Sequence, residues 1–165
     1  MNVRSITLAV TAASVTLIGI SVVIDPKPRL IWNASPSVPI GFYRVHTGDL
    51  PGRGDLAVVA PPHHIARYLD EGGYLPFGLP LIKPVAALPG QRVCRVGDTI
   101  SIDGTVAGAA KASDRFGRPL PVWRGCRTIG VDQLFFMNPN REDSLDGRYF
   151  GPLPVSTVIG VATPL

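Results

Sequence analysis

The sequence is poor in lysine. Lysine and arginine together number 16, and the only lysines are Lys27, Lys83 and Lys111. An arginine guanidinium keeps its proton at any ordinary pH, so it cannot act as a neutral base. A mechanism that uses a lysine base must therefore use one of these three.

Charged residues and metal-binding side chains are also scarce. Charged residues make up 17% of the 165 positions and hydrophobic residues 45%, with 18 Gly and 17 Pro. So low a charge argues against a disordered chain, and so many glycines and prolines argue against a helical bundle. The basic residues are scattered singly, so no nucleic-acid partner is predicted. The 3 His and 2 Cys do not cluster, so no metal site is predicted either.

The amino end contains the longest apolar run. After a flank of residues 1–5, residues 6–24 carry no charge, close to the ~20 residues needed to cross a bilayer core. The run exceeds the ~7 to 15 residues of a secretory core and lacks a small-x-small cleavage site, which favours an uncleaved transmembrane anchor. Residues 25–29, with two prolines, predict a linker to a soluble domain of residues 30–165. Basic residues flank both ends of the run, so charge alone leaves the orientation undecided.

Short apolar runs separated by turn signals organise the soluble domain. They predict strands at residues 56–60, 79–88, 99–102, 105–107, 134–137 and 158–161. Asp103-Gly104 is the strongest hairpin signal in the chain. One helix is predicted, which opens at Pro61-Pro62, runs through His63 to Glu71 and stops at Gly72-Gly73. The predicted fold is a small, mainly antiparallel β domain, coiled or barrel-like, with one short helix and one N-terminal transmembrane helix.

The two cysteines, Cys94 and Cys126, both fall in the soluble domain. An even pair in a membrane-anchored chain fits an oxidising compartment, where the two would form a disulfide. The alternative, two unrelated buried thiols in a cytosolic domain, stays open at the level of sequence.

Ser37 lies in the segment Ser35-Pro-Ser37-Val-Pro39-Ile-Gly41. Two prolines and a glycine deny this segment a regular helix or central strand, so Ser37 is expected on a stiff, partly exposed loop. Such a loop can present a nucleophile to a substrate. It can equally be a proline-rich lead-in to the domain.

Lys83 lies in an apolar segment. Strand alternation places it on the same face as Leu81 and Val85, and neither face of this strand is polar. A desolvated lysine has a lowered pKa and can act as a general base near neutral pH. The alternative is a lysine that reaches out to solvent from an edge strand. Because Lys27 and Lys111 lie in polar surroundings, Lys83 is the predicted lysine base by elimination.

Histidine offers a rival base. His46 precedes Thr47-Gly48, and His63 and His64 open the predicted helix, all places where an exposed histidine is ordinary. A Ser/His/Asp triad is therefore the less favoured alternative.

A third polar segment runs from Asn138 to Gly151. It is either a solvated turn around Asp146-Gly147 or a support for a catalytic site. In the second interpretation Ser144 orients the lysine amine, and Asp146 pairs with Arg148 to brace the wall of the site.

These three segments, in this order, resemble the motifs of the type I signal peptidase family, which are membrane-bound serine proteases with a Ser-Lys dyad. The first motif has the short form typical of the TraF-type conjugative transfer peptidases. In the second, Lys83 precedes Leu88-Pro89-Gly90 at the family spacing. The matching residues of the first and third motifs are Ser35, Ser37, Pro39, Gly41 and Tyr43, and Asn140, Arg141, Ser144, Asp146 and Arg148. The resemblance covers the whole chain, and three motifs in register make it specific.

Three positions depart from the family pattern. Gln91 stands where Asp commonly follows Leu-Pro-Gly, Pro84 stands where Arg is frequent, and Gly147 replaces a common Ser. None of the three carries a proposed proton-transfer atom, so they bear on substrate range more than on activity.

The resemblance implies a role for each matched residue. Ser37 would be the nucleophile and Lys83 the general base, and the Ser35 hydroxyl would hold the oxyanion together with the Ser37 backbone N–H. The residues implied to position the base are Ser144, Asp146 and Arg148. A neutral lysine would take the serine proton during attack and return it to the departing amine, so no metal or organic cofactor is needed.

The resemblance further implies a single-pass protein of the inner membrane whose catalytic domain lies in the periplasm and processes a pilin precursor. The acyl-enzyme would pass to water, or to an amine that cyclises the pilin. Two other functions stay open: a general signal peptidase acting on many exported proteins, and a non-catalytic, membrane-anchored β module that binds pilus components. The lack of a large accessory domain argues against the first, and the three matched motifs argue against the second.

Overall fold

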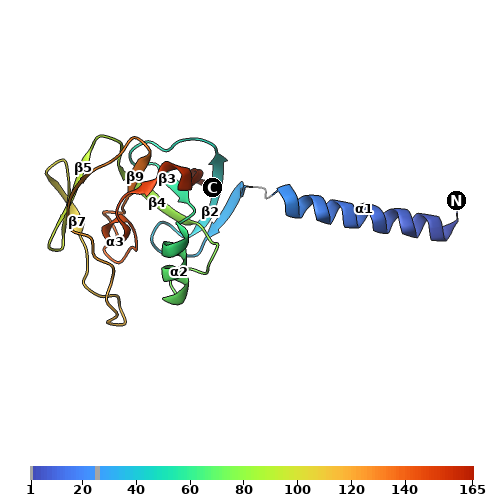
Figure 1. Cartoon of the computed structure of the whole chain (residues 1–165), viewed down its shortest axis with the longest axis horizontal. Helices are drawn as coiled ribbons and strands as arrows, with labels where there is room; N and C mark the ends of the chain where they lie inside the picture. The colour runs from blue at the N-terminus through green and yellow to red at the C-terminus, as the bar shows by residue number, and fades with distance from the viewer. Residues whose placement is uncertain (1, 25–26) are drawn as a thin grey trace.

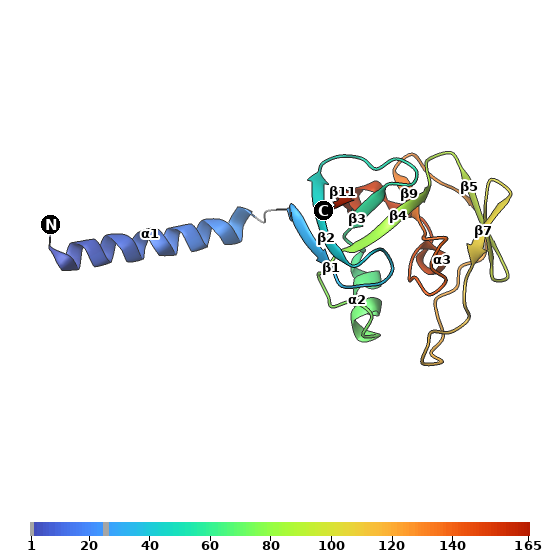
Figure 2. The same ribbon diagram turned by 180° about the vertical axis from the view of Figure 1, so that it is seen from behind.

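The computed structural model describes residues 2–24 and 27–165, so Asp25 and Pro26 of the predicted linker lie outside the described residues. Helix α1 (Val3–Ile24) contains the predicted anchor and begins within the predicted N-terminal flank, because Arg4 and Ser5 are compatible with a first helical turn. Its stretch Val3–Ile20 has a mean hydropathy of 1.7 and is not buried, so it has the length and composition of a membrane span. Figures 1 and 2 show α1 apart from a β-rich domain.

The β-rich domain is built on a seven-stranded antiparallel sheet in the order β1-β2-β11-β3-β4-β9-β10. The last strand of the chain, β11, therefore lies between β2 and β3. The strands are β1 (Leu30–Asn33), β2 (Gly41–Thr47), β3 (Leu56–Val59), β4 (Leu81–Ala87), β9 (Gln133–Phe136), β10 (Leu153–Pro154) and β11 (Val158–Pro164). The predicted mainly β, antiparallel fold is confirmed.

A second sheet has four short strands in the order β7-β6-β5-β8. They are β5 (Arg92–Val96), β6 (Thr99–Ile102), β7 (Thr105–Ala109) and β8 (Gly125–Thr128). The predicted hairpin joins β6 to β7, and its turn residues Asp103 and Gly104 have φ angles of 49° and 82°. Both central residues of a type I′ turn need positive φ, which explains why this dipeptide predicts the hairpin correctly.

Five strands escape the prediction. Strand β2 alternates between buried and exposed residues: Tyr43 and Val45 are buried, and Phe42, Arg44 and His46 are exposed. Because Phe42 is apolar but exposed, the sequence does not show a clear polar face. Strands β5 and β8 contain arginines and cysteines rather than an apolar run. Strands β1 and β10 are short and lie at the two edges of the large sheet. Apolar periodicity is weak in all five.

The helices partly match the prediction. Helix α2 (His63–Glu71) confirms the predicted helix but starts at His63, because Pro62 is its extended N-cap residue. A second helix of the domain, α3 (Gly147–Phe150), lies where a turn or site support was predicted, and a 3-10 turn, η1, covers Val155–Thr157. The domain therefore has one short helix more than predicted, because four residues are too few to show helical periodicity.

Two hydrophobic clusters meet at the central strands β4 and β9. Val85 and Phe136 belong to the cluster around α2, whereas Ala87 and Phe135 belong to the cluster beneath the four-stranded sheet. Because Ile82 belongs to a third cluster and Val85 to the cluster around α2, β4 is covered on both faces, as expected for a continuous apolar run. This arrangement puts Lys83, in the same strand, in the middle of the domain.

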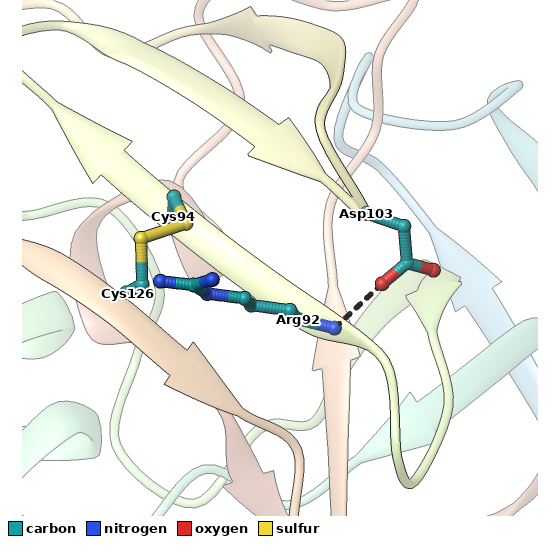
Figure 3. Close-up of a disulfide and its surroundings, with 4 residues drawn as sticks. All are labelled: Arg92, Cys94, Asp103 and Cys126. Atoms are coloured by element: carbon teal, nitrogen blue, oxygen red, sulfur yellow. Dashed lines mark hydrogen bonds between the residues drawn. A yellow bond between two sulfur atoms is a disulfide. The ribbon is translucent and has the colours of Figure 1, made fainter.

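Cys94 of β5 and Cys126 of β8 are directly opposite each other and form a disulfide (Figure 3). The bridge ties β8 to the centre of the small sheet. Nearby, the Arg92 backbone N–H donates a 2.7 Å hydrogen bond to Asp103 in the β6–β7 turn (Figure 3). The hairpin and the bridge therefore brace the same strand from opposite sides.

Candidate active site

Lys83 is buried at the centre of β4, with 4% of its surface exposed. Its Nζ donates a 2.8 Å hydrogen bond to Ser144 Oγ. This burial contradicts the alternative of a lysine reaching out to solvent. Lys27 and Lys111 are both exposed, and Lys111 makes a surface ion pair with Glu142 at 3.8 Å.

Burial changes the acidity of Lys83. Desolvation of the ammonium lowers the pKa of Lys83 from 10.5 to about 8. The positive charge of Arg148 lowers it further, and the carboxylates of Asp146 and Asp143 oppose the shift. About a tenth of a lysine with this pKa is neutral at pH 7, so a useful fraction can accept a proton.

Ser37 lies half-buried on the turn between β1 and β2, as its prolines predict. The side chain of Asn33, at the end of β1, holds this turn. Its Nδ2 donates to the carbonyls of Ser35, Val38 and Pro39 at 2.8, 3.1 and 3.0 Å, and its Oδ1 accepts from the Ser35 N–H at 3.2 Å. Sequence reasoning missed Asn33, although an Asn two residues before a Ser-Pro turn is a known turn-forming signal.

The Ser35 hydroxyl lies beside both the hydroxyl and the backbone N–H of Ser37. Ser35 Oγ is 3.1 Å from Ser37 Oγ, and it accepts the Ser37 backbone N–H at 3.3 Å. A hydroxyl rotates freely and can donate as well as accept. Two donors, the Ser35 hydroxyl and the Ser37 N–H, therefore lie within one turn, where they are engaged in hydrogen bonds between Ser35 and Ser37.

One cavity of about 450 Å³ brings these side chains together, and its lining includes Ser35, Ser37, Lys83 and Ser144. No hydrogen bond joins Ser37 to Lys83 within residues 27–165. Catalytic hydrogen bonds are often long in a free enzyme and tighten once substrate is bound. The cavity has the volume and the mixed polar and apolar lining that suit a peptide segment.

A buried ion pair lies behind the cavity. The Asp146 and Arg148 side chains are 0% and 1% exposed, and Arg148 Nη2 is 2.9 Å from Asp146 Oδ2. Arg148 Nη2 also donates to the carbonyl of Ser144 at 3.2 Å and to that of Arg141 at 2.5 Å. Several hydrogen bonds to a buried ion pair offset the cost of desolvating it. The pair holds the backbone that carries Ser144.

Another wall of the cavity comes from the connection between β7 and β8, which begins near Lys111 and for which the sequence predicted no role. The Tyr74 hydroxyl donates a 2.5 Å hydrogen bond to Asp114, and Arg118 pairs with Asp114 at 2.7 Å. Burial alone would raise the pKa of Asp114, but hydrogen bonds from Tyr74 and Arg118 hold this pKa well below its usual range. Residues far apart in sequence meet here, so no local pattern could have revealed the contact.

The structure places none of the rival histidines in the cavity. His46 Nε2 lies 3.2 Å from Thr163 Oγ1 on the exposed face of β2, and the His63 ring packs against Phe77 at 5.3 Å. His64 is next to His63 at the start of α2. Among the described residues, no three His, Cys, Asp or Glu side chains come together as metal ligands.

Comparisons with known proteins show to which family the chain is similar. The profile of the family described as "Signal peptidase, peptidase S26" matches residues 2–165. The conjugal transfer protein TraF of Agrobacterium fabrum is 39% identical over 145 residues, which are 81% of this chain and 80% of that protein. A probable conjugal transfer protein TraF of Sinorhizobium fredii is 38% identical over 79% of this chain and 73% of its own length.

Two further proteins are more distant. A plasmid transfer protein TraF of Escherichia coli is 28% identical over 81% of this chain and 80% of its own length. A crystal structure of a signal peptidase I from Enterococcus faecalis covers 70% of this chain and 98% of that chain, with 22% identity and a TM-score of 0.43.

Proposed function

The chain belongs to the signal peptidase family, peptidase S26, and we propose that it is a membrane-anchored serine endopeptidase of conjugative transfer that cleaves a pilin precursor. The TraF relatives support a signal-peptidase-like role in conjugation. The apolar helix α1 supports a single membrane anchor. The pilin is the proposed substrate because the resemblance to TraF-type peptidases implies it.

One observation carries this proposal. Lys83 is the buried lysine of the described chain, its pKa is lowered to about 8, and it lines the same cavity as Ser37. A serine needs a neighbouring base to become a nucleophile, and a desolvated lysine can be that base without histidine or metal.

In the proposed reaction, Ser37 Oγ attacks the scissile carbonyl while neutral Lys83 takes the hydroxyl proton. The negative oxygen that forms accepts hydrogen bonds from the Ser35 hydroxyl and the Ser37 N–H, each of which could contribute about 3 kcal/mol. The Lys83 ammonium then gives its proton to the departing amine as the C–N bond breaks. This leaves an ester on Ser37 and a neutral Lys83, which can activate water or a second amine.

Three further residues have supporting roles in this proposal. Ser144 accepts one N–H of Lys83 and so turns the amine toward the cavity. The Asp146–Arg148 pair keeps Ser144 in place through the hydrogen bond from Arg148 to the Ser144 carbonyl. None of the three exchanges a proton with substrate.

We also place the catalytic domain on the periplasmic side of the inner membrane. The disulfide supports an oxidising compartment. Ser37 follows the end of α1 by 13 residues, which limits its height above the bilayer to about 45 Å even for a fully extended chain. A substrate cleaved close to its own membrane segment suits that height.

The test is to incubate the purified full-length protein in detergent with the pilin precursor and to measure product masses. We expect cleavage by the wild type and by Lys27→Ala and Lys111→Ala, and none by Ser37→Ala or Lys83→Ala. Substantial cleavage by Lys83→Ala would overturn the dyad. An intact precursor with the wild type would overturn the assigned substrate.

A further inference from the structure

Asn138 is a buried residue that none of the roles above includes. It follows β9, and only 8% of its surface is exposed. Its Nδ2 donates a 2.6 Å hydrogen bond to the backbone carbonyl of Ser37, a residue 101 positions away. The contact is therefore with the proposed nucleophile itself.

The orientation of the Asn138 carboxamide is determined by its second contact. Oδ1 accepts the backbone N–H of Asn140 at 2.9 Å. Because a backbone N–H can only donate, the oxygen must face Asn140 and the NH₂ group must face Ser37. The turn that contains Asn138 and Asn140 thus directs the Asn138 NH₂ group at the Ser37 carbonyl.

The backbone of Asn138 is held by the buried ion pair. Its N–H donates to Asp146 Oδ2 at 3.1 Å, and its carbonyl accepts from Arg148 Nη2 at 3.3 Å. Arg148 Nη2 also binds the carbonyl of Ser144, whose hydroxyl accepts from Lys83. A continuous set of hydrogen bonds therefore runs from the base, through Ser144, Arg148 and Asn138, to Ser37.

The other hydrogen bonds of the nucleophile turn are local. Asn33 and Tyr43, which bind its carbonyls, belong to β1 and β2 on either side of it. Within residues 27–165, the bond from Asn138 is the one hydrogen bond between the segment Ser35–Pro39 and the part of the domain that carries Lys83. Without it, the turn would be positioned relative to Lys83 only through packing and through β1 and β2, which are separated from β4 by β11 and β3 in the sheet.

We propose that Asn138 is a positioning residue of the reaction: its amide holds the Ser37 carbonyl so that Ser37 Oγ and the Ser37 N–H are presented to the substrate in register with Lys83. This inference rests on the proposed peptidase function. Misplacing a reacting group by about 1 Å can cost about 100-fold in rate. Loss of this donor is therefore expected to lower kcat.

Two substitutions separate the two contacts of the carboxamide. Asn138→Asp keeps an oxygen for the Asn140 N–H but replaces the donor facing Ser37 with an acceptor. Asn138→Leu has a similar size, carries no charge and loses both contacts. Neither change touches the backbone groups that bind Asp146 and Arg148. Gln133→Glu is the matched control, because the described contact of Gln133 is made by an oxygen that accepts from Gly130.

The experiment measures kcat, KM and the pH profile of pilin cleavage, together with the thermal unfolding midpoint. We expect kcat to fall about 10- to 100-fold in both Asn138 variants, with KM nearly unchanged and with the pH limb of Asn138→Leu where it is in the wild type. Gln133→Glu should keep wild-type kinetics.

Three results would overturn the inference. Full activity in Asn138→Asp with loss in Asn138→Leu would mean that only the Asn140 contact matters. Full activity in both variants would mean that neither contact matters. A fall in activity that follows the loss of folded protein would mean a structural role alone. Failure of the proposed function is distinct, because the wild type itself would then leave the precursor uncut.

Discussion

The Lys83 amine and the Ser144 hydroxyl are 2.8 Å apart in the buried part of the domain, and the amine is the donor. A neutral amine has two N–H donors and one lone pair. When Ser144 takes one of the donors, the lone pair is directed elsewhere, and the amine lines the same cavity as Ser37. Ser144 therefore restricts the direction in which Lys83 can accept a proton.

Replacing Ser144 tests this restriction. Ser144→Ala removes the acceptor and lets the amine rotate, so kcat should fall about 10- to 100-fold while KM stays close to the wild-type value. Ser144→Thr keeps a hydroxyl and should recover part of the loss. Steady-state kinetics on the precursor measure both. Equal activity of Ser144→Ala and the wild type would contradict an orienting role.

The pH dependence of cleavage follows from the acidity of Lys83. The neutral form is the active one, and its population grows as pH rises through a pKa of about 8. Hence kcat/KM should climb about tenfold per pH unit below that value and level off above it. A limb near 6 that disappears in His46→Ala would instead support the histidine alternative.

The buried ion pair predicts a large effect on stability. Arg148→Met leaves the Asp146 carboxylate buried without its partner, and removing one member of a buried pair costs about 3 to 5 kcal/mol. Lys111→Met breaks the exposed pair with Glu142 and should cost about 0 to 1 kcal/mol. Urea unfolding of the two variants gives both values. Similar midpoints for the two would show that the Asp146–Arg148 pair contributes no more than a surface contact.

The disulfide should be present in protein taken from cells and should stabilise it. Cys94 and Cys126 are 32 residues apart, for which the chain-entropy model gives roughly 3 to 4 kcal/mol. We expect no thiol labelling of unreduced, denatured protein, and a lower unfolding midpoint in the double Cys→Ser variant. Two reactive thiols would remove the bridge and weaken the periplasmic assignment.

The fate of the acyl-enzyme can be read from one mass spectrum. The resemblance to TraF-type peptidases points to attack by the amino terminus of the pilin, and positioning gives a tethered amine a large advantage over a free one. A cyclic product would be lighter than the trimmed linear chain by one water and would have no free amino terminus. A linear product with a normal amino terminus would mean that the enzyme is a peptidase alone.

Much of the fold and the candidate base Lys83 could be predicted from local patterns, whereas the role of Ser37 rested on the family resemblance. The scarcity of lysine and the apolar setting of Lys83 single it out, and the prolines around Ser37 predict its loop. The Asp103-Gly104 turn and helix α2 are likewise determined by a few neighbouring residues, because turn φ angles and helical periodicity are short-range properties.

Only the tertiary structure decided which distant side chains meet. Asn138 reaches Ser37 and Tyr74 reaches Asp114 across 101 and 40 positions. The position of Asn138, just after β9, depends on the pairing of β9 with β4, where a shift of one residue in register would turn every side chain to the opposite face. Such contacts leave no periodic trace in the sequence, since they are set by strands that come together only in the folded domain.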